Sequence, residues 1–161
     1  MKTPGYLARA LILLSIEVAH LAGAQTTDGV LRLDITPPNV PIREADFTLQ
    51  VIMTNRTTQP MTIVKTSPGC DFSADVRDAE GQMVPSTPAG AELSKCSGRV
   101  ATGRWIRILL QPGESTEESY PISLYYALSR PGVYSVRLFR ELSSQPGRVT
   151  RSNEVQLKLA Q

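Results

Sequence analysis

The sequence predicts an all-β fold, an antiparallel β-sandwich of about seven to eight strands. Short runs rich in β-branched and aromatic residues recur at roughly 8–12-residue spacing, as such sandwiches require. Pro and Gly, with 12 and 11 copies among 161 residues, interrupt these runs. Beyond the first 24 residues, no long stretch carries the 3.6-residue apolar period of a helix. These three observations favour short strands joined by tight turns.

The expected strands are placed by alternation of apolar and polar residues, because successive strand side chains point to opposite faces. From the amino end they span residues 30–35, 47–54, 61–65, 72–77, 82–84, 105–110, 132–140 and 154–159, and residues 119–124 form either a strand or a connection. Turns are expected at 55–60 and 78–81. Residues 91–95 and 124–128 each suit one helical turn. Residues 85–103, rich in Ser, Pro, Gly and Thr, are predicted to form a long loop.

The strand predicted at 132–140 has the clearest pattern in the chain. Pro131 and Gly132 set a turn, after which Tyr134, Val136 and Leu138 share one face. A Tyr just inside a late strand fits the tyrosine corner of Greek-key sandwiches, where its hydroxyl bonds to upstream backbone, here near Arg130. Tyr134 is therefore interpreted as a structural residue rather than part of a working site.

The first 24 residues have the layout of a secretory signal peptide. Lys2 and Arg9 supply a basic start, residues 10–16 an apolar run, and residues 22–24 small side chains before Gln25. The apolar run is shorter than the ~20 residues that span a bilayer. We expect residues 25–161 to form one exported domain, secreted or periplasmic, with no integral membrane span after cleavage. An uncleaved anchor lying in the membrane interface is the alternative.

Loss of residues 1–24 limits the chemistry of the mature chain. The only histidine, His20, lies in this segment. The mature chain then has no imidazole, the commonest general base and zinc ligand near neutral pH. Lys plus Arg falls from 17 to 15 and Asp plus Glu from 15 to 14, leaving a net charge of +1. We expect no cofactor, no metal, and no nucleic acid as partner, since a nearly balanced charge gives no broad basic surface.

Cys70 and Cys96 both lie in the exported part. An even cysteine count in an oxidising compartment favours a disulfide. A redox pair would favour a C-x-x-C arrangement, and a metal site would need more soft ligands. The sequence therefore predicts a structural Cys70–Cys96 disulfide, with two free thiols as the alternative.

Three stretches resemble the back half of secreted bacterial immunoglobulin-like or fibronectin-type-III-like domains: LQPGE at 110–114, YALSRPGVYSV at 126–136, and SNEVQLKL at 152–159. The front half agrees at 48–55 and 75–81. Similar strings occur in deuterolysin-type pro-regions and small sandwich proteinase inhibitors. The resemblance implies an immunoglobulin-like Greek-key fold. It transfers no functional residue, since the mature chain lacks any H-E-x-x-H metal motif and the cysteines fall outside the central strands.

The best candidate binding surface is the strand at 105–110. If Ile106, Ile108 and Leu110 face the core, the only Trp shares the outer face with two arginines. This candidate surface comprises Arg104, Trp105 and Arg107. Exposed Trp and Arg are typical of binding hot spots and of stacking on ligands. In the opposite register Trp105 fills the core, because a one-residue shift moves every side chain to the other face.

The acidic runs suggest no catalytic pair. Glu114, Glu117 and Glu118 crowd one segment, and Asp71, Asp75 and Asp78 another, without calcium-loop spacing. We expect a non-enzymatic exported module that binds a protein or a glycan. The alternative is a proteinase-inhibitor or pro-region-like regulator that inserts the 85–103 loop into a cleft. An enzyme with a carboxylate-only site is a third hypothesis, which two converging, desolvated carboxylates in a cleft would support. The oligomeric state is left open.

Overall fold

The computed structural model describes residues 29–38, 47–93, 96, 105–142 and 145–159. Within these ranges strands predominate, as the sequence predicts. The strands are β1 (Leu31–Thr36), β2 (Leu49–Asn55), β3 (Met61–Lys65), β4 (Ser73–Arg77), β5 (Ile106–Leu110), β6 (Ser115–Tyr120), β7 (Gly132–Leu142) and β8 (Gln145–Leu159). The helices are α1 (Pro68–Asp71), α2 (Pro88–Leu93) and α3 (Ile122–Tyr125). The predicted signal peptide, residues 1–24, lies outside the described residues.

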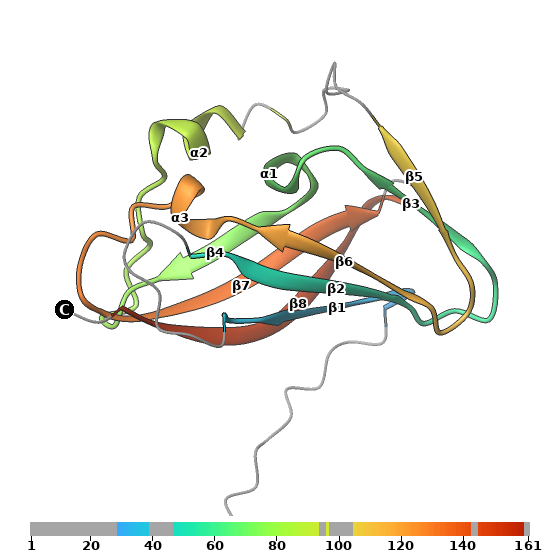
Figure 1. The fold of residues 1–161 in the computed structure, drawn as a ribbon, viewed down its shortest axis with the longest axis horizontal. Helices are drawn as coiled ribbons and strands as arrows, with labels where there is room; N and C mark the ends of the chain where they lie inside the picture. Colours follow the sequence, from blue (N-terminus) through green and yellow to red (C-terminus); the bar gives the residue numbers. More distant parts are fainter. Residues whose placement is uncertain (1–28, 39–46, 94–95, 97–104, 143–144, 160–161) are drawn as a thin grey trace, which may run out of the picture.

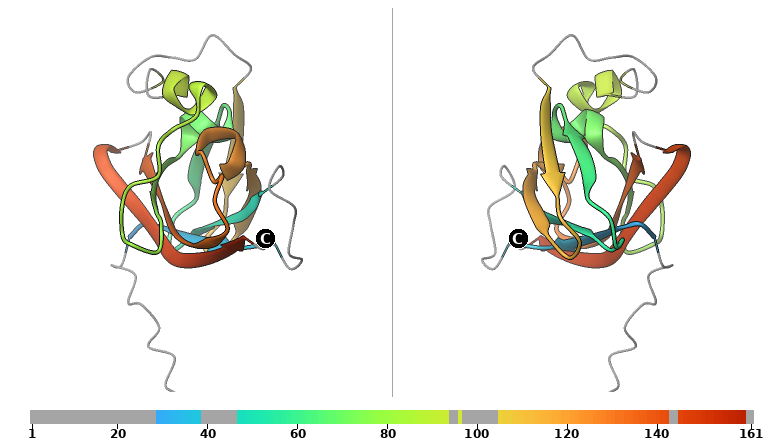
Figure 2. Two further views of the ribbon diagram at one scale, coloured as in Figure 1. Left: turned by 90° about the vertical axis from the view of Figure 1, so that its left-hand side faces the viewer. Right: turned by 90° about the vertical axis from the view of Figure 1, so that its right-hand side faces the viewer.

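The strands form a six-stranded sheet of order β4-β7-β8-β1-β2-β6 and a two-stranded sheet of β3 and β5. The larger sheet is strongly curved, and the three short helices and the β3–β5 pair lie over its concave side (Figures 1 and 2). Four connections join the sheets. Two are short turns, residues 56–60 from β2 to β3 and residues 111–114 from β5 to β6, and the other two run from β3 through α1 to β4 and from β4 through α2 to β5. One end of the two-stranded sheet is therefore joined to the large sheet by a pair of short turns.

The prediction of a wholly antiparallel fold is wrong at one place. β1 runs parallel to β8, with Leu33 opposite Ser152, while the other strand pairs described are antiparallel. Parallel neighbours need a crossover instead of a hairpin. Here the first and last described strands are the neighbours, so the chain between them serves as the connection. No short stretch of the sequence indicates a pairing between strands so far apart, so it could not be predicted.

The core lies on the concave side of the large sheet, lined by the alternate residues of its strands. In β7, Tyr134, Val136 and Leu138 are buried, so the face predicted from the alternation is the one that faces the core. The most deeply buried side chains also include Leu33, Leu49, Val51, Met53, Val76 and Ile122. The Tyr134 hydroxyl donates to Arg130 O at 2.8 Å and accepts from Arg130 N at 3.3 Å. The bond to upstream backbone thus has the partner expected from the sequence.

Several element boundaries differ from the prediction. Residues 82–84 form only an isolated bridge, between Met83 and Arg77. Of residues 119–124, the first two end β6, which begins at Ser115, and the last three start α3. β8 begins nine residues earlier than predicted, because residues 145–153 contain Pro146, Gly147 and many polar residues and do not resemble a strand. The predicted helical turns correspond to α2 and α3, each shifted toward the amino end.

The predicted disulfide is present. Cys70 in α1 is bonded to Cys96, with the two Cα atoms 5.3 Å apart. Part of the predicted 85–103 loop is α2, which packs against α3 so closely that a Cβ on Gly90 would clash with Tyr125 O. Residues 94–95 and 97–103 of this loop lie outside the described residues.

Asn55, at the end of β2, joins the two turns that connect the sheets. Its side-chain nitrogen donates to Gln59 O (2.8 Å) and Leu110 O (3.0 Å), and its side-chain oxygen accepts from Thr57 N and Thr57 Oγ1. Its backbone N–H donates to Glu114 O, and its carbonyl accepts from Gly113 N. The amide group uses both of its donors and both acceptor positions while fully buried. This residue therefore fixes the position of both turns at once.

We predict that Asn55→Ala lowers the free energy of unfolding by about 2–3 kcal/mol, because it leaves buried carbonyl groups such as Leu110 O without a donor. Urea denaturation measures the change. The control is Gln59→Ala, since Gln59 is exposed and contributes its backbone oxygen to this contact. Equal stability of the Asn55→Ala variant and the wild type would contradict the role assigned to Asn55.

Candidate functional site

The candidate binding surface predicted from the sequence lies at the start of the two-stranded sheet. Trp105 directly precedes β5 and is 43% exposed, and Arg107 is exposed within β5. Arg104 lies outside the described residues. Leu110 is buried and Ile108 half-buried, so the register that places Trp105 and Arg107 outside is the one observed.

Ile106 departs from this alternation, since it is 57% exposed although it shares a face with Ile108 and Leu110. β5 belongs to a sheet of only two strands, and its end near Ile106 is farthest from the connection to β6. Leu109, on the opposite face, is also 57% exposed. β5 therefore presents large apolar side chains to solvent on both faces.

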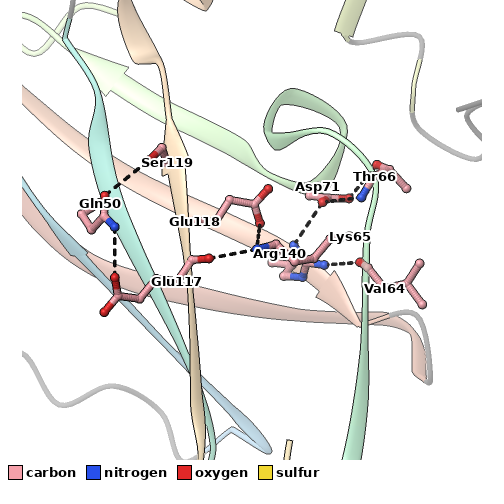
Figure 3. A network of polar contacts seen from close by, with 9 residues as sticks. All are labelled: Gln50, Val64, Lys65, Thr66, Asp71, Glu117, Glu118, Ser119 and Arg140. Carbon is pink, nitrogen blue, oxygen red and sulfur yellow. Dashed lines mark hydrogen bonds and ion pairs between the residues drawn. The ribbon is translucent and has the colours of Figure 1, made fainter. Parts of the chain in front are cut away.

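A second group of side chains gathers where β3, β6, β7 and α1 meet (Figure 3). Arg140 of β7 and Asp71 of α1 lie with Arg140 Nη1 3.8 Å from Asp71 Oδ2, and their side chains are only 4% and 7% exposed. Lys65 Nζ of β3 lies 3.5 Å from Glu118 Oε2 of β6, and the Glu118 side chain is 9% exposed. We call these four residues the ion cluster. Its formal charges balance.

Backbone groups complete the ion cluster. Arg140 Nη2 donates to Val64 O at 2.6 Å, and Lys65 Nζ donates to Glu117 O at 2.9 Å. Asp71 accepts from both the N–H and the hydroxyl of Thr66, each at 2.8 Å. These contacts fasten β3 to β6, to β7 and to α1. Buried charges require such partners, because an isolated charge in the interior is very costly.

Aromatic rings close one side of the cluster. The guanidinium carbon of Arg140 lies 5.0 Å from the centroid of Phe72, within cation–π range. Phe72 in turn meets Tyr120 edge-on, with centroids 6.0 Å apart, and Tyr120 packs on Tyr125. The rings add apolar surroundings that further reduce the access of water to Arg140.

Burial shifts the pKa values of Glu118 and Arg140 in opposite directions. It raises the pKa of Glu118 from the ordinary value of 4.5; Asp71 adds to the rise, while Lys65 and Arg140 oppose it. Burial lowers the pKa of Arg140, and the carboxylates of Asp71 and Glu118 oppose this change. In both groups the loss of hydration outweighs the neighbouring charges. Arg140 Nη1 and Glu118 Oε2 also lack a hydrogen-bond partner among the described residues.

The ion cluster brings together two desolvated carboxylates, Asp71 and Glu118, which is part of the pattern expected of a carboxylate-only enzyme. Each, however, is paired with a cation, and both side chains are almost entirely covered by protein. A general acid or base must lie within hydrogen-bond reach of the substrate. The arrangement is better suited to holding β3 in place than to catalysis.

The sequence contained one signal for this cluster that the strand prediction did not use. Arg140 continues the even-numbered series of Tyr134, Val136 and Leu138, and therefore lies on the buried face of β7. A charged residue on a buried face requires a buried counter-charge. The identity of its partners depends on the tertiary arrangement, and Asp71 comes from α1, a helix that the sequence did not predict.

We predict that Arg140→Ala lowers the free energy of unfolding by about 3–5 kcal/mol, because it leaves buried carboxylates without their cation. The matched control is Arg137→Ala on the opposite face of β7. Arg137 forms an exposed ion pair with Glu154 at 2.9 Å, and we expect a loss of about 0–1 kcal/mol. Denaturant titration compares the two. Equal losses would show that the ion cluster contributes no more than a surface pair.

We also predict a specific pH dependence for Glu118→Gln. Because the pKa of Glu118 is raised on folding, the folded state retains a proton that the unfolded state has released. Stability from this group therefore falls as pH rises from the ordinary value of 4.5 through the raised pKa. The unfolding free energy of the wild type minus that of Glu118→Gln should decrease over this window, measured by denaturation from pH about 4 to about 8. An increase with pH would contradict the assignment.

Among the described residues, no group of three or more His, Cys, Asp and Glu side chains is placed to hold a metal ion. In the same ranges, no helix has the length and apolar character needed to cross a membrane.

Comparison with known proteins leaves the family open. No protein-family model matches the chain, and no curated protein matches it. Among solved structures, the chain is similar to part of a β-glucuronidase from Bacteroides uniformis, with 13% identity and a TM-score of 0.38. The match covers 80% of this chain and 13% of that enzyme.

Proposed function

We propose that this chain is a non-enzymatic, exported protein-binding module whose recognition surface is β5 and the Trp105 that precedes it. The observation that carries the proposal is the exposure of three large apolar side chains within five residues, Trp105 just before β5 and Ile106 and Leu109 on it. Hydrating such large apolar side chains is unfavourable, and their concentration on one segment is typical of an interaction site. Arg107, exposed among them, adds a residue type enriched in binding hot spots.

A protein suits this surface better than a glycan. Ile106 and Leu109 are aliphatic, and apolar burial between side chains is the main gain that they offer a partner. Glycan sites depend on flat aromatic rings with polar groups around them. In the sequence from residue 97 to residue 119, Trp105 is the one aromatic residue. We therefore take a protein as the partner and treat glycan binding as an outcome of the test.

The proposal of a non-enzymatic role rests on the ion cluster. Its two carboxylates are engaged by Lys65 and Arg140 and are nearly inaccessible to a substrate. Export is supported by the Cys70–Cys96 disulfide, because such bonds persist mainly in oxidising compartments. An immunoglobulin-like Greek-key arrangement is the finer fold that we propose, supported by the two-sheet layout and the Tyr134–Arg130 bond.

The test is affinity capture from the envelope and secreted fractions of the producing cells, with Ile106→Lys compared with the wild type. We expect the substitution to reduce specific capture roughly tenfold or more, because a charge would be buried in the interface. The control is Val149→Lys on β8, since Val149 has nearly the same exposure, 56%.

Glycan arrays and a panel of proteinases complete the experiment. Equal capture by wild type and Ile106→Lys would overturn the β5 surface. Binding to a glycan instead of a protein would replace the proposal by a glycan-binding function. Inhibition of a proteinase that Ile106→Lys leaves unchanged would replace it by a proteinase-inhibitor function.

A further inference from the structure

The outer edge of β5 is open. β3 and β5 form a sheet of their own, so among the described strands β5 has a neighbour on one side only. In Figure 2, β5 lies at the side of the molecule next to β3. An open edge presents unpaired N–H and C=O groups that favour pairing with another strand.

The contacts of β3 show which backbone groups of β5 point outward. On the side of β3 away from β5, Val64 O accepts from Arg140, and Thr66 N donates to Asp71. In an antiparallel ladder, directly opposite residues both turn their backbone groups toward each other or both turn them away. Val64 lies opposite Arg107, and Thr62 lies opposite Leu109. Arg107 and Leu109 therefore turn their N–H and C=O groups toward the open edge.

The two edges of this small sheet differ in their protection. Side chains of the ion cluster occupy outward groups on the β3 side, Val64 O by Arg140 and Thr66 N by Asp71, which hinders strand addition there. On β5, no described residue forms a hydrogen bond with the outward groups of Arg107 or Leu109. Of the two edges of the small sheet, β5 is therefore the one open to strand addition.

We infer that β5 pairs with β5 of a second copy of this chain, antiparallel about a two-fold axis at Ile108. This inference rests on the proposed function, since it names the partner of the same surface. Arg107 would lie opposite Leu109 of the second copy, and Ile106 opposite its Leu110. The four outward groups of each strand then all form hydrogen bonds, and the two small sheets become one four-stranded sheet with an isologous interface.

Side-chain chemistry selects this register. In this register, each of the five residues of β5 lies opposite a residue of β5 in the second copy. A shift that centres the axis on Arg107 would place two arginines directly opposite each other, which is unfavourable. A shift to Leu109 would carry Arg107 past the end of the strand, opposite Gln111 in the turn. The register at Ile108 also covers Ile106 and Leu109, the two most exposed apolar residues of β5.

Sedimentation of the purified protein over a range of concentrations tests the inference. The wild type should form a dimer. Leu109→Lys should weaken it roughly tenfold or more, because two symmetric pairs would then place Lys opposite Arg107. Leu109→Glu should preserve it, because Glu would lie opposite Arg107. The exchange Arg107→Glu with Leu109→Lys should also restore it. Val149→Lys is the control for charge alone, and thermal unfolding confirms that each variant folds.

A wild type that stays monomeric would overturn the inference, and so would equal weakening by Leu109→Lys and Leu109→Glu, which is the result expected of unspecific apolar adhesion. A monomer that still captures a different protein through Ile106 would overturn only this inference and leave the proposed function standing. A dimer with the predicted charge pattern that captures no other protein would support the inference and remove the need for another partner.

Discussion

The position of β5, and with it every surface proposed here, depends on one buried amide. Asn55 binds Leu110 O at the end of β5 while its own backbone bonds to Glu114 and Gly113 in the turn that follows. The same side chain closes the β2–β3 connection through Thr57 and Gln59. A side chain that satisfies four partners has one allowed orientation. The two-stranded sheet is therefore set at a fixed angle to the large one.

The opposite end of the small sheet is also held by polar contacts. There Arg140 and Lys65 connect β3 to the large sheet through Val64, Glu117 and Glu118. Apolar packing alone tolerates small shifts of one layer over another, whereas buried hydrogen bonds and ion pairs require particular partners. Tethers at both ends give the small sheet one arrangement. The ion cluster contributes this specificity even where the burial of its charges makes little net contribution to stability.

Alternation in the sequence was sufficient to locate most strands and the core face of β7, because a buried face leaves a period of two in the residues themselves. The sequence allowed Trp105 to be either exposed or part of the core, and in the structure it is exposed. The Cys70–Cys96 bond was predicted from the even number of cysteines and the expected export of the chain, and the structure contains it. Each of these inferences uses properties of a short segment or of the whole chain.

The features that could not be predicted are those that join distant segments. Val64 O and Arg140 are 76 residues apart, and Asn55 Nδ2 meets Leu110 O across 55 residues. Asn55 lies at the start of a polar stretch whose residues predict only a turn. Glu118 lies in an acidic run, which is typical of a solvent-exposed surface. Their burial depends on which strands become neighbours. Among these residues, only the burial of Arg140 could be inferred locally, because Arg140 lies on the apolar face of β7.

The parallel pairing of β1 with β8 has a consequence for how the chain folds. In the six-stranded sheet this pairing is the only junction between β4-β7-β8 on one side and β1-β2-β6 on the other. Within the two halves, β1–β2 and β7–β8 are consecutive along the chain and can pair early, but the sheet closes only when β1 and β8, more than a hundred residues apart, meet. Closing so long a loop is slow compared with local pairing. Until β8 pairs with β1, each half-sheet has an open edge at this junction, so this one pairing covers two strand edges that could otherwise pair with other chains.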